Sequence, residues 1–370
     1  MIAYVLPTRN RPECLAQTLD ALGALPPHHA EVIVVDNASS PPATAPRELP
    51  NRLPVTLLRR PTNEGAAARN VGVRAADPSC EWVLMLDDDS HPTGLGFLDA
   101  LHEQPADVAA VCAEIFLPTG NHEAGGLPEV PIGCGVAYRR AAFESMRIGR
   151  DAGYDPRFGF YSEEYDLAAR LIRAGHRIVM ERRFIVKHEK TAAGRSMDAI
   201  LRRLVRNNAW VMARYAPAAL KRTEVRRVLS RYARIAMKEH ATIGYALGAA
   251  ELLWSLAAQP RTQLDARQWD RFTGKAACRS ALLRAWAQRR FESAALIAPG
   301  KNDHIVLECL LEMGVRVVDD PRLADALVIG TLSPGPMLDA AASLAPDPRV
   351  ITSWHIPAAP EAPQALRTAA

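Results

Sequence analysis

The stretch Glu81-Trp82-Val83-Leu84-Met85-Leu86-Asp87-Asp88-Asp89-Ser90 joins a short apolar run to three consecutive carboxylates. Residues 82–86 predict a buried strand, and such a strand delivers the residues after it to the carboxyl edge of a sheet, where open α/β folds bind ligands. Adjacent carboxylates repel one another unless water or a cation intervenes, and Mg²⁺ or Mn²⁺ accepts such oxygen ligands. The alternative is an acidic turn that caps the next helix, and this stretch alone favours that alternative.

The composition is that of a globular protein in a reducing compartment. The chain has 370 residues, enough for two or three domains, with 48% hydrophobic and 23% charged residues. Its six cysteines are scattered without a Cys-x-x-Cys pair, which argues against a disulfide framework and a zinc site. The start lacks the basic region of a signal peptide, and no uncharged apolar run reaches the roughly 20 residues of a membrane span. We therefore expect a cytoplasmic protein.

Strands and helices alternate over the first part of the chain, which predicts a doubly wound, mostly parallel α/β sheet. Apolar runs predict strands at residues 2–6, 31–35, 55–59, 82–86, 108–116, 133–139, 177–181 and 184–187. Helical spacing or helix-start signals predict helices at 13–25, 63–76, 95–104, 141–146 and 162–175, the last with Ser162 as its cap and Gly175 as its stop. Residues 118–131 form a long loop rich in glycine and proline.

The remaining chain divides by charge and pattern. We expect a first domain at 1–195, basic amphipathic helices at 196–290, a small Rossmann-like α/β domain at 291–357 and a tail at 358–370. The small domain has predicted strands at 294–298, 315–318, 326–329 and 349–352 and a helix at 303–313. Residues 196–290 hold 19 Lys/Arg against 6 Asp/Glu, a net of +13, so the rest carries −9 of the total of +4.

The basic segment predicts an anionic partner surface. We expect it to make a peripheral contact with anionic membranes on their inner face, and we expect no nucleic-acid partner. In the helix that follows Ser196, apolar positions alternate with basic ones: Leu201, Leu204, Val205 and Val211 against Arg202, Arg203 and Arg206. The alternative for any single arginine is a solvated face or an intersubunit surface.

Five motifs in order resemble family 2 glycosyltransferases with the GT-A fold. They are Pro7-Thr8-Arg9-Asn10-Arg11, Val34-Val35-Asp36-Asn37, Asn63-x-Gly65-x-x-x-Arg69-Asn70, Leu86-Asp87-Asp88-Asp89 and Ser162-Glu163-Glu164-Tyr165-Asp166-Leu167. The resemblance covers about residues 2–190. It implies an inverting transferase that uses a nucleotide-diphospho-sugar and a divalent metal, Mn²⁺ or Mg²⁺. The family's Gln-x-x-Arg-Trp motif of processive synthases is absent from the sequence, which favours addition of a single sugar.

The predicted donor site combines residue chemistry with the resemblance. The nucleotide-binding candidates are Pro7, Thr8, Arg9, Asp36, Asn63, Gly65, Arg69, Asp87 and Asp88. Thr8, Arg9 and Asp36 follow the first two strands, where this topology places a base and ribose. Asp36 can instead form an Asx turn with Ala38 or Ser39. Asn63, Gly65 and Arg69 open a helix whose N-terminus suits phosphate, although Arg69 can also be a surface residue.

The resemblance implies a separate role for each of the three carboxylates. It implies that Asp87 contacts the ribose side and that Asp89 holds the metal bridging the diphosphate, with Asp88 as the one of the three most readily spared. His188 ends a strand, and neutral imidazole suits Mn²⁺ and to some extent Mg²⁺. A metal-ligand role and a structural role for His188 stay equally open from the sequence.

The acidic helix start is the predicted source of the catalytic base. A carboxylate whose pKa is raised by its neighbours can take the proton of an attacking acceptor hydroxyl. We expect Glu164 to be this base, with Glu163 as the alternative, because the family usually has aspartate where Glu164 stands. The competing explanation is that these acidic residues only interact favourably with the helix dipole. Gly133 and Gly135, where a strand allows close approach, and Asp166, which orients a neighbour or caps the helix, complete the predicted acceptor side.

These features predict a hexosyltransferase that moves one sugar from a UDP-, dTDP- or GDP-sugar to a glycan or lipid-linked acceptor in cell-envelope polysaccharide biosynthesis. A sugar-phosphate nucleotidyltransferase is the first alternative, but it needs a glycine-rich loop with Arg and Lys after the first strand, and Pro7-Thr8-Arg9-Asn10 does not supply one. A non-catalytic glycan-binding or scaffold protein with the same fold is the second.

Overall fold

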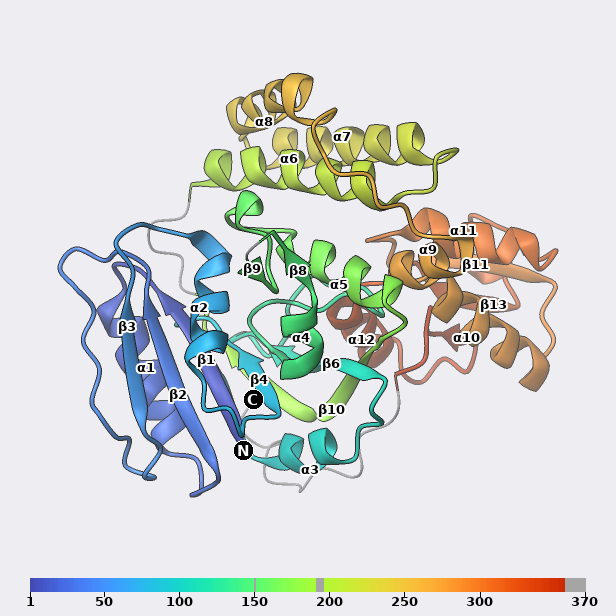
Figure 1. Cartoon of the computed structure of the whole chain (residues 1–370). Helices are drawn as coiled ribbons and strands as arrows, with labels where there is room; N and C mark the ends of the chain where they lie inside the picture. The colour runs from blue at the N-terminus through green and yellow to red at the C-terminus, as the bar shows by residue number, and fades with distance from the viewer. Residues whose placement is uncertain (150, 191–195, 357–370) are drawn as a thin grey trace.

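A computed structural model describes residues 1–149, 151–190 and 196–356, and its largest element is an eight-stranded sheet (Figure 1). The strand order is β3-β2-β1-β4-β7-β6-β10-β5. The strands are β1 (Ile2–Thr8), β2 (Ala30–Asp36), β3 (Val55–Arg59), β4 (Trp82–Met85), β5 (Ser90–Pro92), β6 (Val108–Phe116), β7 (Val136–Arg139) and β10 (Arg177–His188). Only β7 and β5 run antiparallel to their neighbours in this sheet. The prediction of a mostly parallel α/β fold is confirmed.

Helices cover both faces of this sheet because alternate residues of each strand point to opposite sides. On one face, Tyr4 and Leu6 of β1 share a core with α1. On the other, Val5 shares a core with α2, where Gly72 lets the helix lie so close that a Cβ there would come 2.5 Å from Val5. The helices are α1 (Pro12–Gly23), η1 (Gly65–Ala67), α2 (Ala68–Ala75), α3 (Gly96–His102), α4 (Arg140–Ser145), η2 (Pro156–Phe158) and α5 (Glu163–Arg173).

Two local predictions in this region were wrong. The predicted strands at 177–181 and 184–187 are one strand, β10, whose pairing with β6 shifts register between Glu181 and Ile185. The polar residues between them therefore sit in a bulge and do not end the strand. Ser162 makes no side-chain cap; it has a φ of 69°, and α5 begins directly after this left-handed residue. Beside α4, the short strands β8 (Arg147–Ile148) and β9 (Asp151–Ala152) form a separate hairpin.

The basic segment forms five helices. They are α6 (Met197–Tyr215), α7 (Lys221–Lys238), α8 (Thr242–Ser255), α9 (Ala266–Thr273) and α10 (Lys275–Gln288), and Figure 1 shows the first three as a layer beyond α5. Leu201, Val205 and Val211 are fully buried, and Leu204 packs against the same core. The predicted membrane-facing apolar stripe of α6 thus faces the protein interior. None of the helices in the described part of the chain is long and apolar enough to span a bilayer.

The last described residues form a four-stranded parallel sheet in the order β12-β11-β13-β14. Its elements are β11 (Ser293–Ile297), α11 (Asp303–Glu312), β12 (Arg316–Val317), η3 (Pro321–Leu323), β13 (Ala326–Ile329), α12 (Pro334–Ser343) and β14 (Val350–Ile351). We call residues 293–351 the C-terminal α/β unit. Helix α12 was not predicted, and α10 packs against α11. The predicted tail at 358–370 lies outside the described residues, and the predicted domain boundaries remain predictions.

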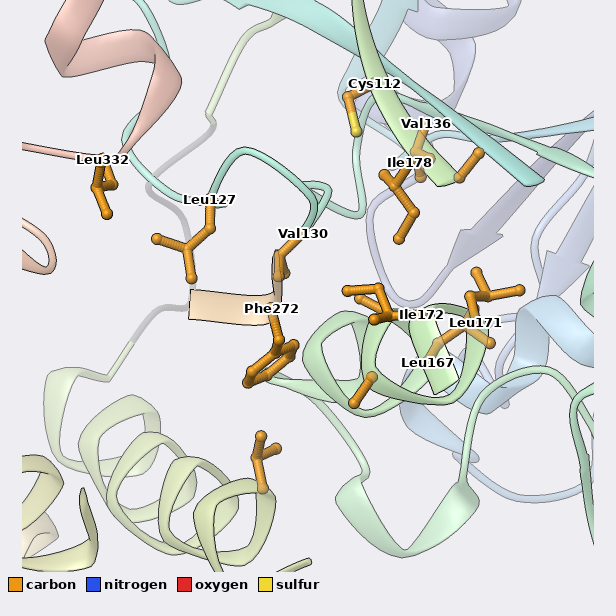
Figure 2. Packing of buried hydrophobic residues seen from close by; sticks show 14 of the residues in the cluster. Cys112, Leu127, Val130, Val136, Leu167, Leu171, Ile172, Ile178, Phe272 and Leu332 are labelled. Carbon is orange, nitrogen blue, oxygen red and sulfur yellow. The ribbon is translucent and has the colours of Figure 1, made fainter. Parts of the chain in front are cut away.

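The core runs without a break from the large sheet into the C-terminal α/β unit (Figure 2). Leu167 and Ile172 of α5 pack in the same cluster as Val136 and Ile178 of the sheet. The cluster continues through Leu127, Val130, Phe272 and Leu332. Loop 118–131 therefore lies between the sheet and the C-terminal α/β unit, with most of its second half buried.

Candidate active site

The three consecutive aspartates after β4 have different surroundings at the carboxyl edge of the sheet. The side chain of Asp87 is 31% exposed and forms an ion pair with the buried Arg69. Asp88 and Asp89 are buried, and one guanidinium reaches both: Arg11 lies 2.5 Å from Asp88 and 2.7 Å from Asp89. Asp87 therefore differs from the other two: it pairs with Arg69, whereas Asp88 and Asp89 are buried and share Arg11.

Asp88 connects the acidic stretch to β1 and α1. Its carboxylate accepts a hydrogen bond of 2.8 Å from Thr8, and its backbone carbonyl accepts one of 2.8 Å from Thr18. Burial raises the pKa of Asp88 to about 6, although Arg11 and Thr8 act in the opposite direction. This side chain holds the turn in place, which agrees with Asp88 being the aspartate most readily spared from ligand contact.

Asp89 and His188 face each other. His188 Nε2 lies 3.4 Å from Asp89 Oδ1, and His188 Nδ1 lies 2.9 Å from Glu123 Oε2. Burial alone would lower the pKa of His188, but its contacts with Asp89, Cys134 and Glu123 raise it to about 12. The Glu123 carboxylate orients the ring, as a second carboxylate commonly does for a metal-binding histidine.

These residues fit a divalent cation. In the described part of the chain, the buried Nε2 of His188 has no hydrogen-bond partner, yet a carboxylate oxygen stands opposite it. Ligand atoms of Asp87, Cys134 and His188 also lie within 4.8 Å of one another. Burial raises the pKa of the Cys134 thiol. Carboxylate oxygens of Asp87 and Asp89 and the imidazole of His188 are groups that could hold such a cation.

The predicted nucleotide-side residues lie at the same edge of the sheet, and several are held by local contacts. Asp36 accepts backbone hydrogen bonds from Ser39 at 2.8 Å and Ala43 at 3.1 Å, so the turn that competed with nucleotide binding is formed. Burial alone would raise the pKa of Asp36, but these hydrogen bonds lower it below its usual value. Pro7 is buried at the end of β1, whereas Arg9 beyond it is exposed.

The start of α2 is a tight contact between two loops. Asn63 accepts a hydrogen bond of 3.0 Å from the backbone of Gly65, which has a φ of 62°. A Cβ on Gly65 would lie 2.1 Å from the carbonyl oxygen of Gly159, so only glycine fits. Arg69 is not a surface residue: it is 2% exposed, and it donates to the Leu86 carbonyl at 3.1 Å while pairing with Asp87. Arg69 therefore sets the position of Asp87.

The two glutamates at the start of α5 stand near the same edge. Glu163 is 3% exposed, and within the described residues its Oε2 has no hydrogen-bond partner. Burial and the neighbouring Glu164 raise the pKa of Glu163, and burial also raises that of Glu164, with Asp87 contributing to both. A Cβ on Gly133 would lie 2.5 Å from Glu164 Oε1, so this glycine makes room for the carboxylate. Gly135 instead allows packing against Ile115.

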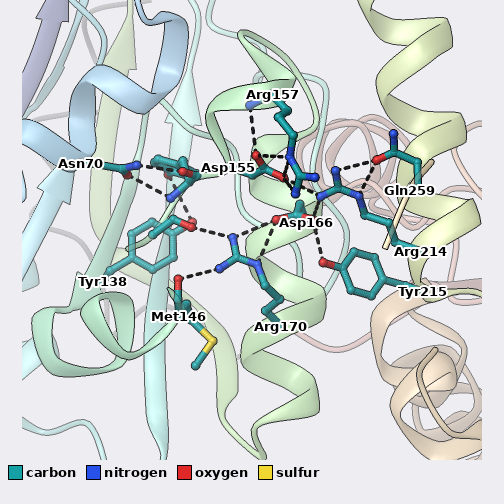
Figure 3. A network of polar contacts seen from close by, with 12 residues as sticks. Asn70, Tyr138, Met146, Asp155, Arg157, Asp166, Arg170, Arg214, Tyr215 and Gln259 are labelled. Atoms are coloured by element: carbon teal, nitrogen blue, oxygen red, sulfur yellow. Dashed lines mark hydrogen bonds and ion pairs between the residues drawn. The ribbon is translucent and has the colours of Figure 1, made fainter. Parts of the chain in front are cut away.

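Asp166 belongs to a buried ionic network and not to an open site (Figure 3). Its Oδ1 accepts from Arg214 and from the Tyr215 hydroxyl, both at 2.7 Å, and its Oδ2 accepts from Arg170 at 2.9 Å. Arg214 also donates to Asp155 at 2.8 Å. With no exposed surface, Asp166 anchors α5 to α6 and orients these neighbours, and its place on the acceptor side stays a prediction.

Three residues of this region were missed as site residues. Arg11 lies in the first quoted motif, so the motif itself was the signal. Glu123 comes from the irregular loop 118–131, where no pattern marks it. Lys301 comes from the C-terminal α/β unit, and its Nζ lies 4.6 Å from the ring centroid of Tyr165, next to Glu164 in the chain. Burial lowers the pKa of Lys301 to about 8.

Comparison with known families gives this geometry a context. Residues 4–125 match the model of the family described as Glycosyl transferase family 2. The matched segment is thus similar to family 2 glycosyltransferases. It is 37% identical over 90 residues to an uncharacterized glycosyltransferase of Haemophilus influenzae, covering 24% of this chain and 29% of that one. It is 29% identical over 209 residues to the pre-mycofactocin glycosyltransferase of Mycobacterium tuberculosis, covering 51% and 42%. The chain thus spans less than half the length of these two relatives.

Solved structures that resemble the chain include Staphylococcus aureus TarS 1–349, with a TM-score of 0.47, 16% identity and coverage of 78% of this chain and 87% of that one. Another is the mannosyltransferase PcManGT from Pyrobaculum calidifontis in complex with GDP-Man and Mn²⁺, with a TM-score of 0.45, 16% identity and coverage of 69% and 87%.

Proposed function

We propose that this family 2 glycosyltransferase moves one hexose from a nucleotide-diphospho-sugar to a hydroxyl acceptor, with inversion at the anomeric carbon. The observation that carries the proposal is the pair Glu163–Glu164, whose raised pKa values suit a general base, set near Asp87 at the carboxyl edge of β4. A carboxyl buried only to cap a helix would not require a glycine at position 133 to make room for it.

A divalent metal, Mn²⁺ or Mg²⁺, is part of the proposal. Asp89, His188 and Asp87 would hold it, and when bound it would offset negative charge on the leaving diphosphate. The imidazole of His188 favours Mn²⁺ over Mg²⁺, which prefers all-oxygen ligands. Glu123 keeps the ring of His188 aimed at Asp89.

The donor nucleotide is proposed to occupy the edge formed by Pro7, Thr8, Arg9 and Asp36, with Asn63 and Gly65 at the opening of α2. The proposed donors are UDP-, dTDP- and GDP-sugars. Arg9 is the exposed cation of this group, whereas Arg69 and Asp88 act by positioning: Arg69 holds Asp87, and Asp88 holds the turn.

The transfer step rests on the proposed base. Glu164 takes the proton of the acceptor hydroxyl while its oxygen forms a bond to the anomeric carbon. The bond between that carbon and the diphosphate oxygen breaks on the opposite face, and the nucleoside diphosphate leaves with its electron pair. Attack from the face opposite the leaving group inverts the anomeric configuration. Glu163, one residue earlier, is the alternative base.

The acceptor is proposed to be a glycan or a lipid-linked glycan of the cell envelope, reached from the cytoplasm. A relative from Myxococcus xanthus, 27% identical over 238 residues, is named an O-antigen biosynthesis protein, which supports an envelope glycan. This chain covers 18% of that relative, so the comparison supports a class of acceptor and does not identify one acceptor molecule.

The test is a panel of nucleotide sugars incubated with the protein in Mn²⁺, in Mg²⁺ and in a chelator, with release of nucleoside diphosphate as the readout. We expect release with one donor, dependent on metal and greatly reduced in the Glu163→Gln/Glu164→Gln double variant. Pyrophosphate release from a nucleoside triphosphate and a sugar phosphate would identify a nucleotidyltransferase instead. Donor binding without turnover across envelope glycan acceptors would favour a non-catalytic glycan-binding protein.

A further inference from the structure

Helix α8 packs closely against α6 at two glycines. A Cβ on Gly244 would lie 2.1 Å from the carbonyl oxygen of Asp198, and one on Gly248 would lie 2.4 Å from that of Arg202. The backbone amide of Gly244 also donates to Asp198 Oδ1 at 2.6 Å. Because both glycines must face α6, the rotation of α8 about its own axis is set, and the opposite face must point outward.

The outward face of α8 is apolar and exposed. Ile243 is 68% exposed, Leu247 47%, Leu253 85% and Trp254 67%. Met237, near the end of α7, is 64% exposed. Among the described residues, large exposed apolar side chains are concentrated in these five. The others lie singly or in pairs on other elements. A concentration of this kind marks an interaction surface.

The neighbouring helix α7 is basic. It carries seven Lys/Arg and one acidic residue, Glu224. Within the described part of the chain, Arg227 is the only one of the seven cations with a carboxylate within 4.0 Å. Arg234 and Lys238 are exposed on the last turns of α7, near Met237. Unneutralised cations beside an exposed apolar face are the pattern of helices that lie in a membrane interface.

We propose that the outward face of α8, together with the basic end of α7, is a docking surface for an anionic lipid bilayer. Helix α8 has 14 residues, or about 21 Å at the rise of an α-helix, which is too short to cross the hydrocarbon core. It lies in the interface plane, with Trp254 and Leu253 at the boundary between headgroups and acyl chains and Arg234 and Lys238 against lipid phosphates. The proposed membrane contact is therefore this surface and not the apolar stripe of α6, which is buried.

A second copy of the chain is the competing occupant, and charge disfavours it. In a twofold contact the basic α7 of one copy would stand beside the basic α7 of the other, since a twofold contact pairs the same surface on both copies. An anionic bilayer supplies the opposite charge, and it also takes up exposed apolar side chains. The proposal does not depend on the proposed sugar transfer, but it would bring the protein to a lipid-linked acceptor.

Co-sedimentation with vesicles tests the proposal on the full chain. The vesicles are phosphatidylcholine alone or phosphatidylcholine mixed with phosphatidylglycerol, each at low and high salt. We expect the protein to pellet with the anionic vesicles at low salt and much less with the neutral ones. The Leu253→Ser/Trp254→Ser variant should lower the bound fraction about tenfold or more, because both side chains would lose their burial in the interface. Arg234→Glu/Lys238→Glu should abolish the preference for anionic vesicles.

Matched controls separate this surface from exposed apolar or basic residues in general. Leu311→Ser/Leu323→Ser removes two leucines that are 59% and 70% exposed on the C-terminal α/β unit and should leave binding unchanged. Arg52→Glu/Arg322→Glu reverses two exposed arginines far from α8 in sequence, with side chains 83% and 88% exposed, and should do the same. All the altered side chains are exposed, and circular dichroism checks the fold of each variant.

Three results would overturn the proposal. One is equal recovery with neutral and anionic vesicles at both salt concentrations. Another is a loss of binding in the control variants as large as in the α8 variant. The third is a wild-type protein that does not bind vesicles and is a dimer, together with an α8 variant that is a monomer, both measured by sedimentation velocity. This result would assign the surface to a second copy of the chain. If the serine variant does not fold, Trp254→Phe provides the same test, through loss of a vesicle-dependent blue shift in tryptophan emission.

Discussion

Lys301 of the C-terminal α/β unit places its Nζ 4.6 Å from the ring centroid of Tyr165, and the two side chains are also hydrogen-bonded. Tyr165 follows the proposed base Glu164 in α5, and the Lys301 ammonium interacts electrostatically with the Glu164 carboxylate. A cation from one unit of the protein thus acts on the proposed base in another.

Replacing Lys301 should change the pH dependence of turnover. The charged Lys301 favours the ionised form of Glu164, the form that acts as a base. Lys301→Met removes that charge, so the pKa of Glu164 should rise and the acid limb of the pH–rate profile should move to higher pH. Lys301→Arg keeps the charge and should retain most of the wild-type profile. An acid limb at the same pH in the wild type and in Lys301→Met would show that Lys301 only joins the two units.

Asp89→Ala should abolish metal-dependent nucleotide binding; because it also removes the buried partner of Arg11 and His188, circular dichroism checks that the variant folds. The change removes a carboxylate at the edge of the sheet and no apolar packing. Asp107→Ala removes an exposed carboxylate that pairs with Arg177, and it serves as the control. Calorimetric titration of nucleotide with and without Mn²⁺ measures the effect. Unchanged affinity of Asp89→Ala in Mn²⁺ would exclude Asp89 as a ligand.

Glu123→Gln should weaken the metal site without removing a ligand. Glu123 holds the ring of His188 and also accepts from Lys190 at 2.9 Å. Loss of such a supporting carboxylate lowers metal affinity about 10- to 100-fold. A Mn²⁺ titration by electron paramagnetic resonance measures the affinity directly, without substrate. If Glu123→Gln binds Mn²⁺ as the wild type does, the bond to His188 is structural.

Glu164→Gln should keep donor binding and lose turnover, because it removes a base with little change in volume. Glu163→Gln is the matched variant on the same helix turn. Donor dissociation constants and turnover numbers, measured for both, assign the base. Normal turnover in Glu164→Gln together with loss in Glu163→Gln would move the base to Glu163.

Arg214→Met should destabilise the protein by about 3–5 kcal/mol, the usual cost of removing one partner from a buried ion pair. Arg214 is 1% exposed and bridges Asp155 and Asp166, which would be left as buried carboxylates. Arg226→Met, on the exposed face of α7, is the control and should have little effect. Urea unfolding followed by circular dichroism gives both values, and equal midpoints would contradict this role for the network.

Local sequence determined the strands of the large sheet and the position of the acidic stretch. Val55–Arg59 and Val108–Phe116 both have the predicted bounds, but only the second is a buried strand; the first is a partly exposed strand at the edge of the sheet. The same logic put Asp87, Asp88 and Asp89 at the sheet edge. The prediction of a side-chain cap at Ser162 failed because the backbone there is left-handed. Helix α5 begins after this left-handed residue without a side-chain cap.

Only the tertiary structure decided which residues meet. Glu123 reaches His188 across 65 residues, and Lys301 reaches Tyr165 across 136, because the path of the connecting chain brings them together and no local pattern records that path. The amphipathic pattern of α6 predicted an apolar face but could not say what covers it. The glycines of α8 turn its other apolar side outward, so packing between helices, and not the periodicity of either one, determined which hydrophobic face the protein exposes.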